Sequence, residues 1–265
     1  MSGDVVWLGT SWKMTKTIGE ARAWVDAVVA GIGPGVPGVQ PFVLPAHTAL
    51  APVRDRLEAL TTGGTGPLLL GAQDAHPGPE GAGTGDVSVR MVADAGARLL
   101  EIGHSERRSS YGEDDRTVAR KVRAALDGGL RPLVCVGEPA EVRGRGEQIT
   151  FVRAQVQAAL APVAPDELGR VVLAYEPVWA IGEHGRRPET AEVAPVLDEV
   201  ARLSRSRAAG TAPVVLYGGS VDEGNAADLL GVETVDGLFV GRAAWDAAGF
   251  LALLDLARAA AARRA

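Results

Sequence analysis

The chain has 265 residues, of which 46% are hydrophobic and 23% charged, a globular composition that excludes a disordered or fibrous protein. Its formal net charge is −6 and it has no block of basic residues, so we expect no binding to nucleic acid. The single cysteine excludes an internal disulfide framework, and we expect neither a signal peptide nor a membrane-spanning segment. These features together predict a cytoplasmic protein.

Eight short apolar runs recur along the chain, about 33 residues apart, which is roughly what a strand, a helix and two loops require. Continuous apolar runs of this length are typical of strands that are buried on both faces, as in a parallel sheet. The predicted strands are residues 5–9, 42–45, 68–72, 99–103, 133–137, 171–175, 214–218 and 238–241.

The segments between these runs mostly show the spacing of amphipathic helices. In residues 18–30, for example, Ala21, Trp24, Val25 and Val28 share one face. The predicted helices are residues 18–30, 117–126, 151–160, 191–203 and 249–261, with a frayed, basic end at 257–265.

Strands alternating with helices predict an α/β protein, a (β/α)₈ barrel in one domain over residues 1–265. An open, doubly wound sheet is the alternative. It is disfavoured because a dinucleotide site requires a glycine-rich loop directly after a strand, and the nearest candidate, residues 31–35, follows a predicted helix.

The ends of the predicted strands carry polar residues, and in such a barrel these ends build the active site. A carboxylate at a strand end becomes a better base when it is desolvated, a histidine donates a hydrogen bond, a lysine supplies charge and glycine-rich turns bind phosphate. The combination predicts proton abstraction beside a carbonyl of a small phosphorylated sugar. The residues are Ser11, Trp12 and Lys13, then His104 to Arg108, Glu176 to Trp179, Gly218 to Ser220, and Gly241 with Arg242.

Each of these residues also has a purely structural interpretation. Lys13 could be solvated, His104 could cap a loop, and Glu176 could pair with an arginine. Cys135 is expected to be a small buried apolar group. The joint occurrence at five strand ends favours a site. The remaining histidines are scattered, so we expect no metal site.

Five motifs in order resemble those of the triosephosphate isomerase family, and they extend over the whole chain. They are Ser-Trp-Lys-Met at 11–14, Gly-His-Ser-Glu-Arg-Arg at 103–108, Cys-Val-Gly-Glu at 135–138, Ala-Tyr-Glu-Pro-Val-Trp-Ala-Ile-Gly at 174–182 and Tyr-Gly-Gly-Ser-Val at 217–221. The family fold is the TIM barrel, in agreement with the strand pattern.

The resemblance implies a role for each matching residue. Glu176 is the proton-shuttling base, His104 the neutral electrophile and Lys13 the electrostatic partner. It also implies an enzyme that needs no cofactor, and a homodimer whose interface includes the loop at 73–86. The implied lid comprises Pro177, Val178, Trp179, Ala180, Ile181 and Gly182, and the implied phosphate ligands are Gly182, Ser220, Gly241 and Arg242.

Three departures from the family pattern surround the expected ligand. Ser11 replaces an asparagine, residues 183–187 replace a Thr-Gly continuation of the lid, and Arg242 replaces a glycine. If Arg242 needed a positive φ it would be strained; otherwise its side chain could pair with an acid or reach outward.

With these residues, the sequence resembles the branch of the family that isomerises erythrulose phosphates in erythritol breakdown. This branch implies conversion of L-erythrulose 1-phosphate to D-erythrulose 4-phosphate, with Ser11 leaving room for one hydroxymethyl group. Triosephosphate isomerase itself, the enzyme of glycolysis and gluconeogenesis, is the alternative. A non-catalytic phosphate-binding barrel is disfavoured because Glu176 and His104 are both present.

Overall fold

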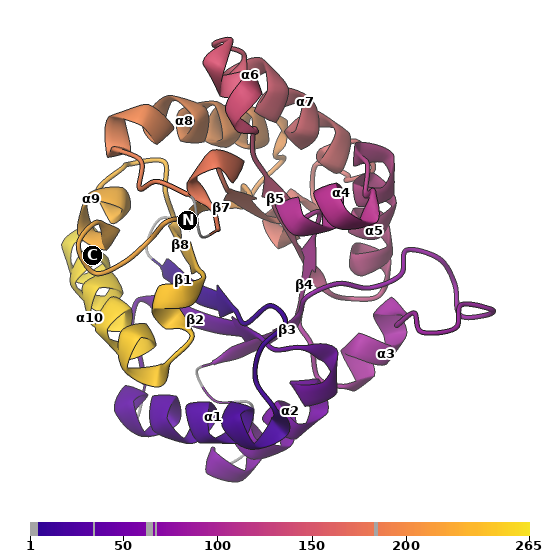
Figure 1. Ribbon diagram of the computed structural model, residues 1–265, viewed down its shortest axis with the longest axis vertical. Coiled ribbons are helices and arrows are strands. Elements are labelled where there is room, and N and C mark those ends of the chain that lie inside the picture. Colours follow the sequence, from indigo (N-terminus) through magenta and orange to yellow (C-terminus); the bar gives the residue numbers. More distant parts are fainter. Residues whose placement is uncertain (1–4, 34, 62–65, 67, 183–184) are drawn as a thin grey trace.

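The computed structural model describes residues 5–33, 35–61, 66, 68–182 and 185–265. Eight parallel strands follow one another in chain order around a closed barrel, in which the first strand pairs with both the second and the last (Figure 1). This confirms the predicted (β/α)₈ barrel and excludes the open sheet. The strands are β1 (Val6–Ser11), β2 (Val39–Leu44), β3 (Leu69–Ala72), β4 (Leu99–Ile102), β5 (Arg131–Val136), β6 (Val172–Tyr175), β7 (Val214–Gly219) and β8 (Gly237–Val240).

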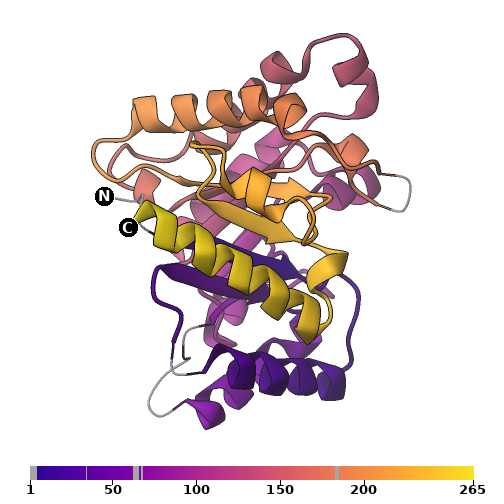
Figure 2. The same cartoon turned by 90° about the vertical axis from the view of Figure 1, so that its left-hand side faces the viewer.

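Helices cover the outside of the barrel (Figures 1 and 2). They are α1 (Ile18–Ile32), α2 (His47–Leu60), α3 (Val89–Asp94), α4 (Ser105–Tyr111), α5 (Asp115–Asp127), α6 (Ala140–Gly144), α7 (Gln148–Leu160), α8 (Thr190–Arg207), α9 (Ala226–Leu230) and α10 (Ala247–Arg264). Short 3₁₀ turns are η1 (Leu168–Arg170), η2 (Val178–Ala180) and η3 (Arg242–Ala244). Among the described residues, no helix is long and apolar enough to cross a membrane.

The five helices predicted from apolar spacing are α1, α5, α7, α8 and α10, and each is longer than predicted. Polar caps that lie outside the apolar pattern set some of their ends. The Asp114 carboxylate accepts a hydrogen bond from the Thr117 N–H at the start of α5, and Asp246 does the same for Gly249 in α10.

The frayed end predicted for residues 257–265 is wrong, because α10 continues as a helix to Arg264. Ala261 is buried, and the Arg264 guanidinium donates to the carbonyls of Leu230 and Val235 at 2.8 Å each. The helix packs against α1, α9 and β1, and Figure 2 shows it in yellow across the side of the barrel.

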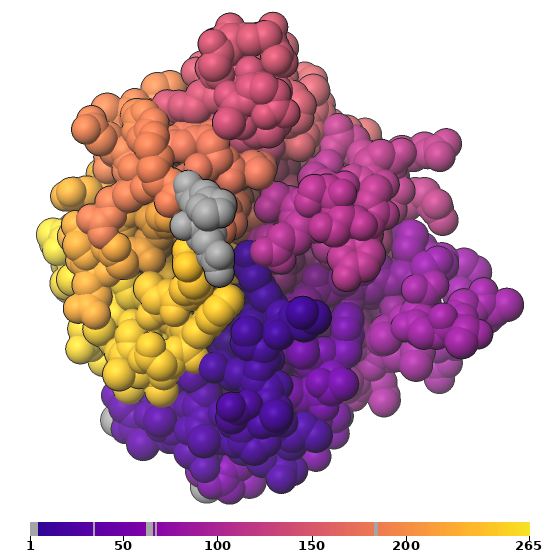
Figure 3. All heavy atoms as spheres, in the orientation of Figure 1, coloured from indigo at the N-terminus to yellow at the C-terminus, as the bar shows by residue number. Residues whose placement is uncertain are grey.

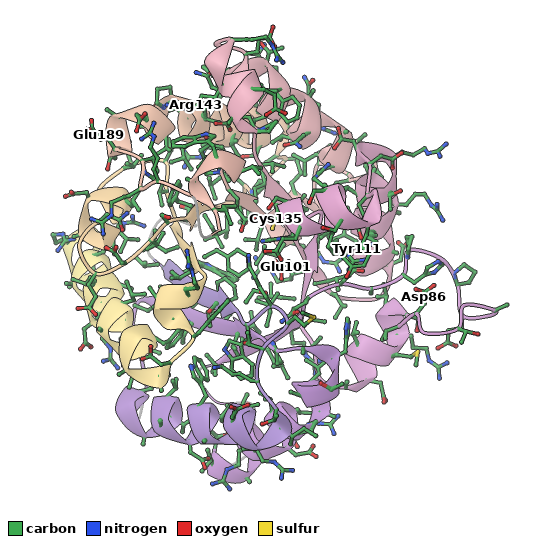
Figure 4. The ribbon with its side chains drawn as sticks, viewed as in Figure 1. Asp86, Glu101, Tyr111, Cys135, Arg143 and Glu189 are labelled. Carbon is green, nitrogen blue, oxygen red and sulfur yellow. The ribbon has the colours of Figure 1, made fainter. Side chains whose placement is uncertain are left out.

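Side chains alternate along each strand between the barrel interior and the helix layer. In β4, Leu99 faces the interior, whereas Leu100 and Ile102 pack under the helices. Glu101 therefore shares the interior face with Leu99. Figure 4 shows Glu101 and Cys135 near the centre of the ring of strands.

Three aromatic side chains fill the barrel interior. The Phe42 ring lies 5.9 Å from Trp7 and 5.6 Å from Phe239, measured between ring centroids. Gly9 makes this packing possible, because a Cβ there would lie 2.2 Å from the Phe42 ring. The interior is thus a packed core, and a ligand can enter only at an end of the barrel.

Candidate active site

Two connected cavities lie at the carboxyl ends of the strands, where segments from the start, middle and end of the chain meet (Figure 3). We call the smaller one, of about 340 Å³, the inner cavity; it is lined by Ser11, Lys13, Glu101, His104, Glu176, Ile181, Gly219, Phe239, Val240 and Gly241. The outer cavity shares Lys13, Ile181, Gly219 and Gly241 with it and adds Glu106, Ala180, Gly182, Ser220, Val221, Asp222, Arg242, Ala243 and Trp245. All the predicted catalytic and phosphate-binding residues line one of the two.

Glu176 follows β6 and is 6% exposed. Burial raises the pKa of its carboxyl group, while the nearby His104, Lys13 and Cys135 oppose that rise. Its Oε2 is buried and has no hydrogen-bond partner among the described residues. A carboxylate oxygen left without a partner in a cavity can accept a proton from a bound molecule.

Two glycines provide the space that Glu176 occupies. A Cβ at Gly218 would lie 2.9 Å from the Oε1 of Glu176, and a Cβ at Gly137 would lie 1.8 Å from its carbonyl oxygen. Cys135 is a neighbour of this carboxyl group and opposes the rise of its pKa. The expectation for Cys135 is therefore incomplete: the residue is buried in the barrel interior, but it is also a polar neighbour of Glu176.

His104 follows β4 and caps the first turn of α4. The backbone N–H of Glu106 donates to its Nδ1 at 3.1 Å, so in the neutral ring Nε2 carries the proton. Nε2 lies 3.7 Å from the Oε2 of Glu176. A hydrogen-bond donor and a proton acceptor thus face the same point in the inner cavity.

Lys13 lies between the two cavities and has a positive φ of 53°, which is uncommon for a residue with a side chain. Its Nζ is 2.6 Å from the Oε1 of Glu106. The Gln73 side chain holds the backbone in place by donating to the carbonyls of Lys13 and Leu44 at 3.0 and 2.9 Å. The geometry fixes a positive charge beside the cavity entrance.

Ser11 is the last residue of β1, and its hydroxyl donates to the Oε2 of Glu101 at 2.9 Å. Both residues are buried, at 5% and 3% exposure. Burial and the nearby charge of Glu176 raise the pKa of Glu101 to about 8. The sequence analysis did not identify Glu101 as a site residue.

The predicted lid begins at η2 and is anchored to the end of β5. Trp179 donates from Nε1 to the Oε1 of Glu138 at 2.7 Å, and the Tyr175 hydroxyl donates to the other oxygen at 3.0 Å. The Arg143 guanidinium lies over the Trp179 ring, 4.4 Å from its centroid. Trp179 is therefore packed at the start of the predicted lid and does not line either cavity; neither do Pro177 and Val178.

The far end of the lid is held by the loops after β7 and β8. The Ser220 hydroxyl donates to the Ala180 carbonyl at 2.8 Å, and Nη2 of Arg242 donates to the Gly182 carbonyl at 2.7 Å. Arg242 does not have a positive φ, so its backbone is not strained. Its side chain pairs with a backbone carbonyl and not with an acidic residue. Gly182 itself has a φ of +86°, which favours glycine.

The lid continuation that differs from the family pattern lies only partly within the described structure. Glu183 and His184 fall outside the described residues. Arg186 pairs with Glu192, and Arg187 pairs with Asp222. These two arginines therefore tie the lid to α8 and to the loop after β7, and neither lines the inner cavity. Within the described ranges, no group of three or more His, Cys, Asp or Glu side chains is placed to hold a metal ion.

Comparison with known proteins agrees with this geometry. The model of the family described as triosephosphate isomerase matches residues 6–257. The protein of Mycolicibacterium smegmatis named L-erythrulose-1-phosphate isomerase is 47% identical over 255 residues, which cover 96% of this chain and 94% of that protein. A protein of the same name from Mesorhizobium japonicum is 42% identical over 258 residues, covering 97% and 98% of the two chains.

A solved structure gives the same result. The crystal structure of triosephosphate isomerase from Bartonella henselae matches with a TM-score of 0.82 and 33% sequence identity, over 95% of this chain and 98% of that one. The family resemblance predicted from the motifs is confirmed. The chain belongs to the triosephosphate isomerase family.

Proposed function

We propose that the protein converts L-erythrulose 1-phosphate to D-erythrulose 4-phosphate, as a step of erythritol breakdown in the cytoplasm. The observation that carries the isomerase chemistry is the Oε2 of Glu176, which has no hydrogen-bond partner in the described part of the chain and lies 3.7 Å from the Nε2 of His104. The substrate assignment is supported by the relatives named L-erythrulose-1-phosphate isomerase and by Ser11 in the inner cavity.

The reaction moves one proton between neighbouring carbons. The Glu176 carboxylate takes the proton from the hydroxyl-bearing carbon beside the carbonyl, and the electron pair forms an enediol(ate) while His104 donates from Nε2 to the carbonyl oxygen. Return of the proton to the other carbon moves the carbonyl by one position, which gives the isomeric ketose phosphate. Lys13 stabilises the negative charge that develops. The reaction needs no external oxidant or reductant, so we propose that no cofactor takes part.

The phosphate group is assigned to the outer cavity. Lys13 supplies a cation there, and the backbone of Gly182, Gly241 and Arg242 and the side chain of Ser220 surround the same space. The segment from Pro177 to Gly182 acts as the lid over the bound substrate, hinged at Trp179. Because the phosphate lies at the mouth, the reacting carbons extend into the inner cavity between Glu176 and His104.

The alternative function is triosephosphate isomerase, which the Bartonella henselae structure favours because it has the same fold at 33% identity. The two substrates differ at one position: L-erythrulose 1-phosphate carries a hydroxymethyl group where dihydroxyacetone phosphate carries a hydrogen. A non-catalytic phosphate-binding barrel would not need a buried carboxyl group with a raised pKa and an oxygen that has no partner among the described residues, as Glu176 has.

Substrate preference tests the proposed function. We expect kcat/KM to favour L-erythrulose 1-phosphate over dihydroxyacetone phosphate by roughly 10- to 200-fold, the typical value of filling a pocket with one more carbon. Ser11→Asn should shift the ratio toward the triose, because the longer amide occupies the space beside Glu101. The four kcat/KM values are measured in coupled assays. A wild type that prefers the triose, with an unchanged ratio in Ser11→Asn, would favour the alternative.

We further propose that the protein is a homodimer, with the loop at residues 73–86 in the interface. This loop projects from the barrel after β3, and residues 79–86 within it are exposed (Figures 1 and 4). Sedimentation equilibrium should give twice the mass of the 27.4 kDa chain. A mass of one chain at micromolar concentration would contradict the dimer.

A further inference from the structure

Glu101 is a carboxyl group in a barrel interior that is otherwise mostly apolar. It occupies the interior face of β4 above Leu99, and it is 3% exposed. Burying an ionisable group costs free energy unless hydrogen bonds compensate for the lost water. Among the described residues, the Ser11 hydroxyl is its only hydrogen-bond partner, and that bond uses Oε2 alone. A carboxyl group with one oxygen left over indicates a second partner that comes from outside the protein.

The cavities show which part of a substrate that partner would be. Ser11, Glu101, His104 and Glu176 line the inner cavity and not the outer one, whereas Gly182, Ser220 and Arg242 line only the outer one. A sugar phosphate anchored in the outer cavity therefore points its carbon chain inward. The atoms beyond the reacting carbon would then lie in the inner cavity, which Ser11 and Glu101 line together with His104 and Glu176.

The protonation state of Glu101 fits a hydroxyl partner. With its pKa raised to about 8 by burial and by Glu176, the carboxyl group is mainly neutral at pH 7. A neutral carboxyl group has one O–H donor and one carbonyl acceptor. Because Ser11 donates to Oε2, a proton on Oε1 would be free to be donated to an alcohol oxygen. A neutral group also adds no negative charge beside the carboxylate of Glu176.

We propose that Glu101, held by Ser11, is a specificity-determining residue that binds the terminal hydroxyl of the four-carbon substrate. This inference rests on the proposed function, because dihydroxyacetone phosphate has no carbon, and so no hydroxyl, beyond the reacting carbon. It also changes the interpretation of Ser11: the shorter side chain makes room, and its hydroxyl orients Glu101. Ser11 and Glu101 therefore act together. The presence of Ser11 in place of the family's asparagine does not by itself account for the specificity.

The test combines a change in the enzyme with a change in the substrate. The probe is 4-deoxy-L-erythrulose 1-phosphate, which keeps all four carbons and lacks only the terminal hydroxyl. In the wild type, we expect removal of that hydroxyl to lower kcat/KM on the order of 10- to 100-fold, because the buried carboxyl group then loses its partner. In Glu101→Leu, which keeps the approximate volume without polar atoms, the two substrates should differ by less than about threefold.

Glu101→Gln is the matched control, because its amide has nearly the same shape and offers a carbonyl acceptor and an NH₂ donor. We expect it to retain most of the discrimination between the two substrates. A merely structural role of Glu101 would lower kcat/KM for both substrates by the same factor. If Glu101→Leu does not fold, Ser11→Ala decides, since it releases the carboxyl group without adding volume and should reduce the discrimination.

The outcomes separate this inference from the proposed function. A wild type that prefers dihydroxyacetone phosphate to L-erythrulose 1-phosphate would overturn the proposed function itself. A wild type that prefers the four-carbon substrate, but does not discriminate against its deoxy analogue, would overturn the inference about Glu101 alone. Equal discrimination in the wild type and in Glu101→Leu would also overturn it, because another group would then bind the hydroxyl.

Discussion

Replacing Glu176 with glutamine should lower kcat on the order of 10²- to 10⁴-fold while KM changes little. Glutamine keeps the size of the side chain but cannot accept the proton, and the Oε2 that it replaces has no hydrogen-bond partner to lose among the residues that the structure describes. Steady-state kinetics with L-erythrulose 1-phosphate measures the effect. The matched control is Glu58→Gln on the exposed surface of α2, which should leave kcat unchanged. A Glu176→Gln variant within threefold of the wild type would rule out Glu176 as the base.

Two further measurements address the same carboxylate. Burial raises the pKa of Glu176 above the ordinary glutamate value of 4.5. As the pH is lowered, we therefore expect kcat/KM to begin falling at a higher pH than an ordinary glutamate would give.

Gly218→Ala keeps the carboxylate but places a Cβ 2.9 Å from its Oε1. Displacement by about 1 Å can cost about 100-fold in rate. Gly19→Ala, where a Cβ would have no neighbour within 4 Å, is the control.

The second large effect is expected at His104. His104→Ala removes the donor that faces the carbonyl oxygen, and loss of one such donor typically costs about 10²–10³ in kcat. Binding should weaken much less, because the proposed phosphate contacts lie in the outer cavity, which His104 does not line. A variant that loses affinity but keeps kcat would make His104 a binding residue instead. Nitrogen-15 NMR of the neutral ring should show the proton on Nε2, as the hydrogen bond from Glu106 to Nδ1 requires.

The architecture could be predicted from the sequence because it depends on a regular pattern. Each strand is a continuous apolar run, and parallel strands buried on both faces require such runs. Element ends were less predictable, since they depend on single contacts. β1 continues to Ser11 because that residue still pairs with Leu44 of β2, and α10 reaches Arg264 because its guanidinium binds two carbonyls.

The site could be predicted only where a motif or a strand end marked it. Glu101 was missed because it lies within an apolar run, between Leu100 and Ile102, and not at the end of that run. The available signal was the alternation of side chains along the strand. Residues 99 and 101 both face the barrel interior, so a charged side chain at position 101 cannot reach the solvent outside the barrel. The contact of Arg242 with Gly182 could not be predicted, because it joins two loops that are 60 residues apart in the chain.

Closure of the barrel has a consequence for how the protein matures. β1 completes its pairing only with β8, where Trp7 lies beside Gly237, and Trp245 donates from Nε1 to the carbonyl of Ser11 at 2.9 Å. A growing chain on the ribosome therefore holds its first strand half-paired until β8 has been synthesised. Gly241, directly after β8, lines both cavities, so catalytic activity should arise only once β8 has joined the barrel.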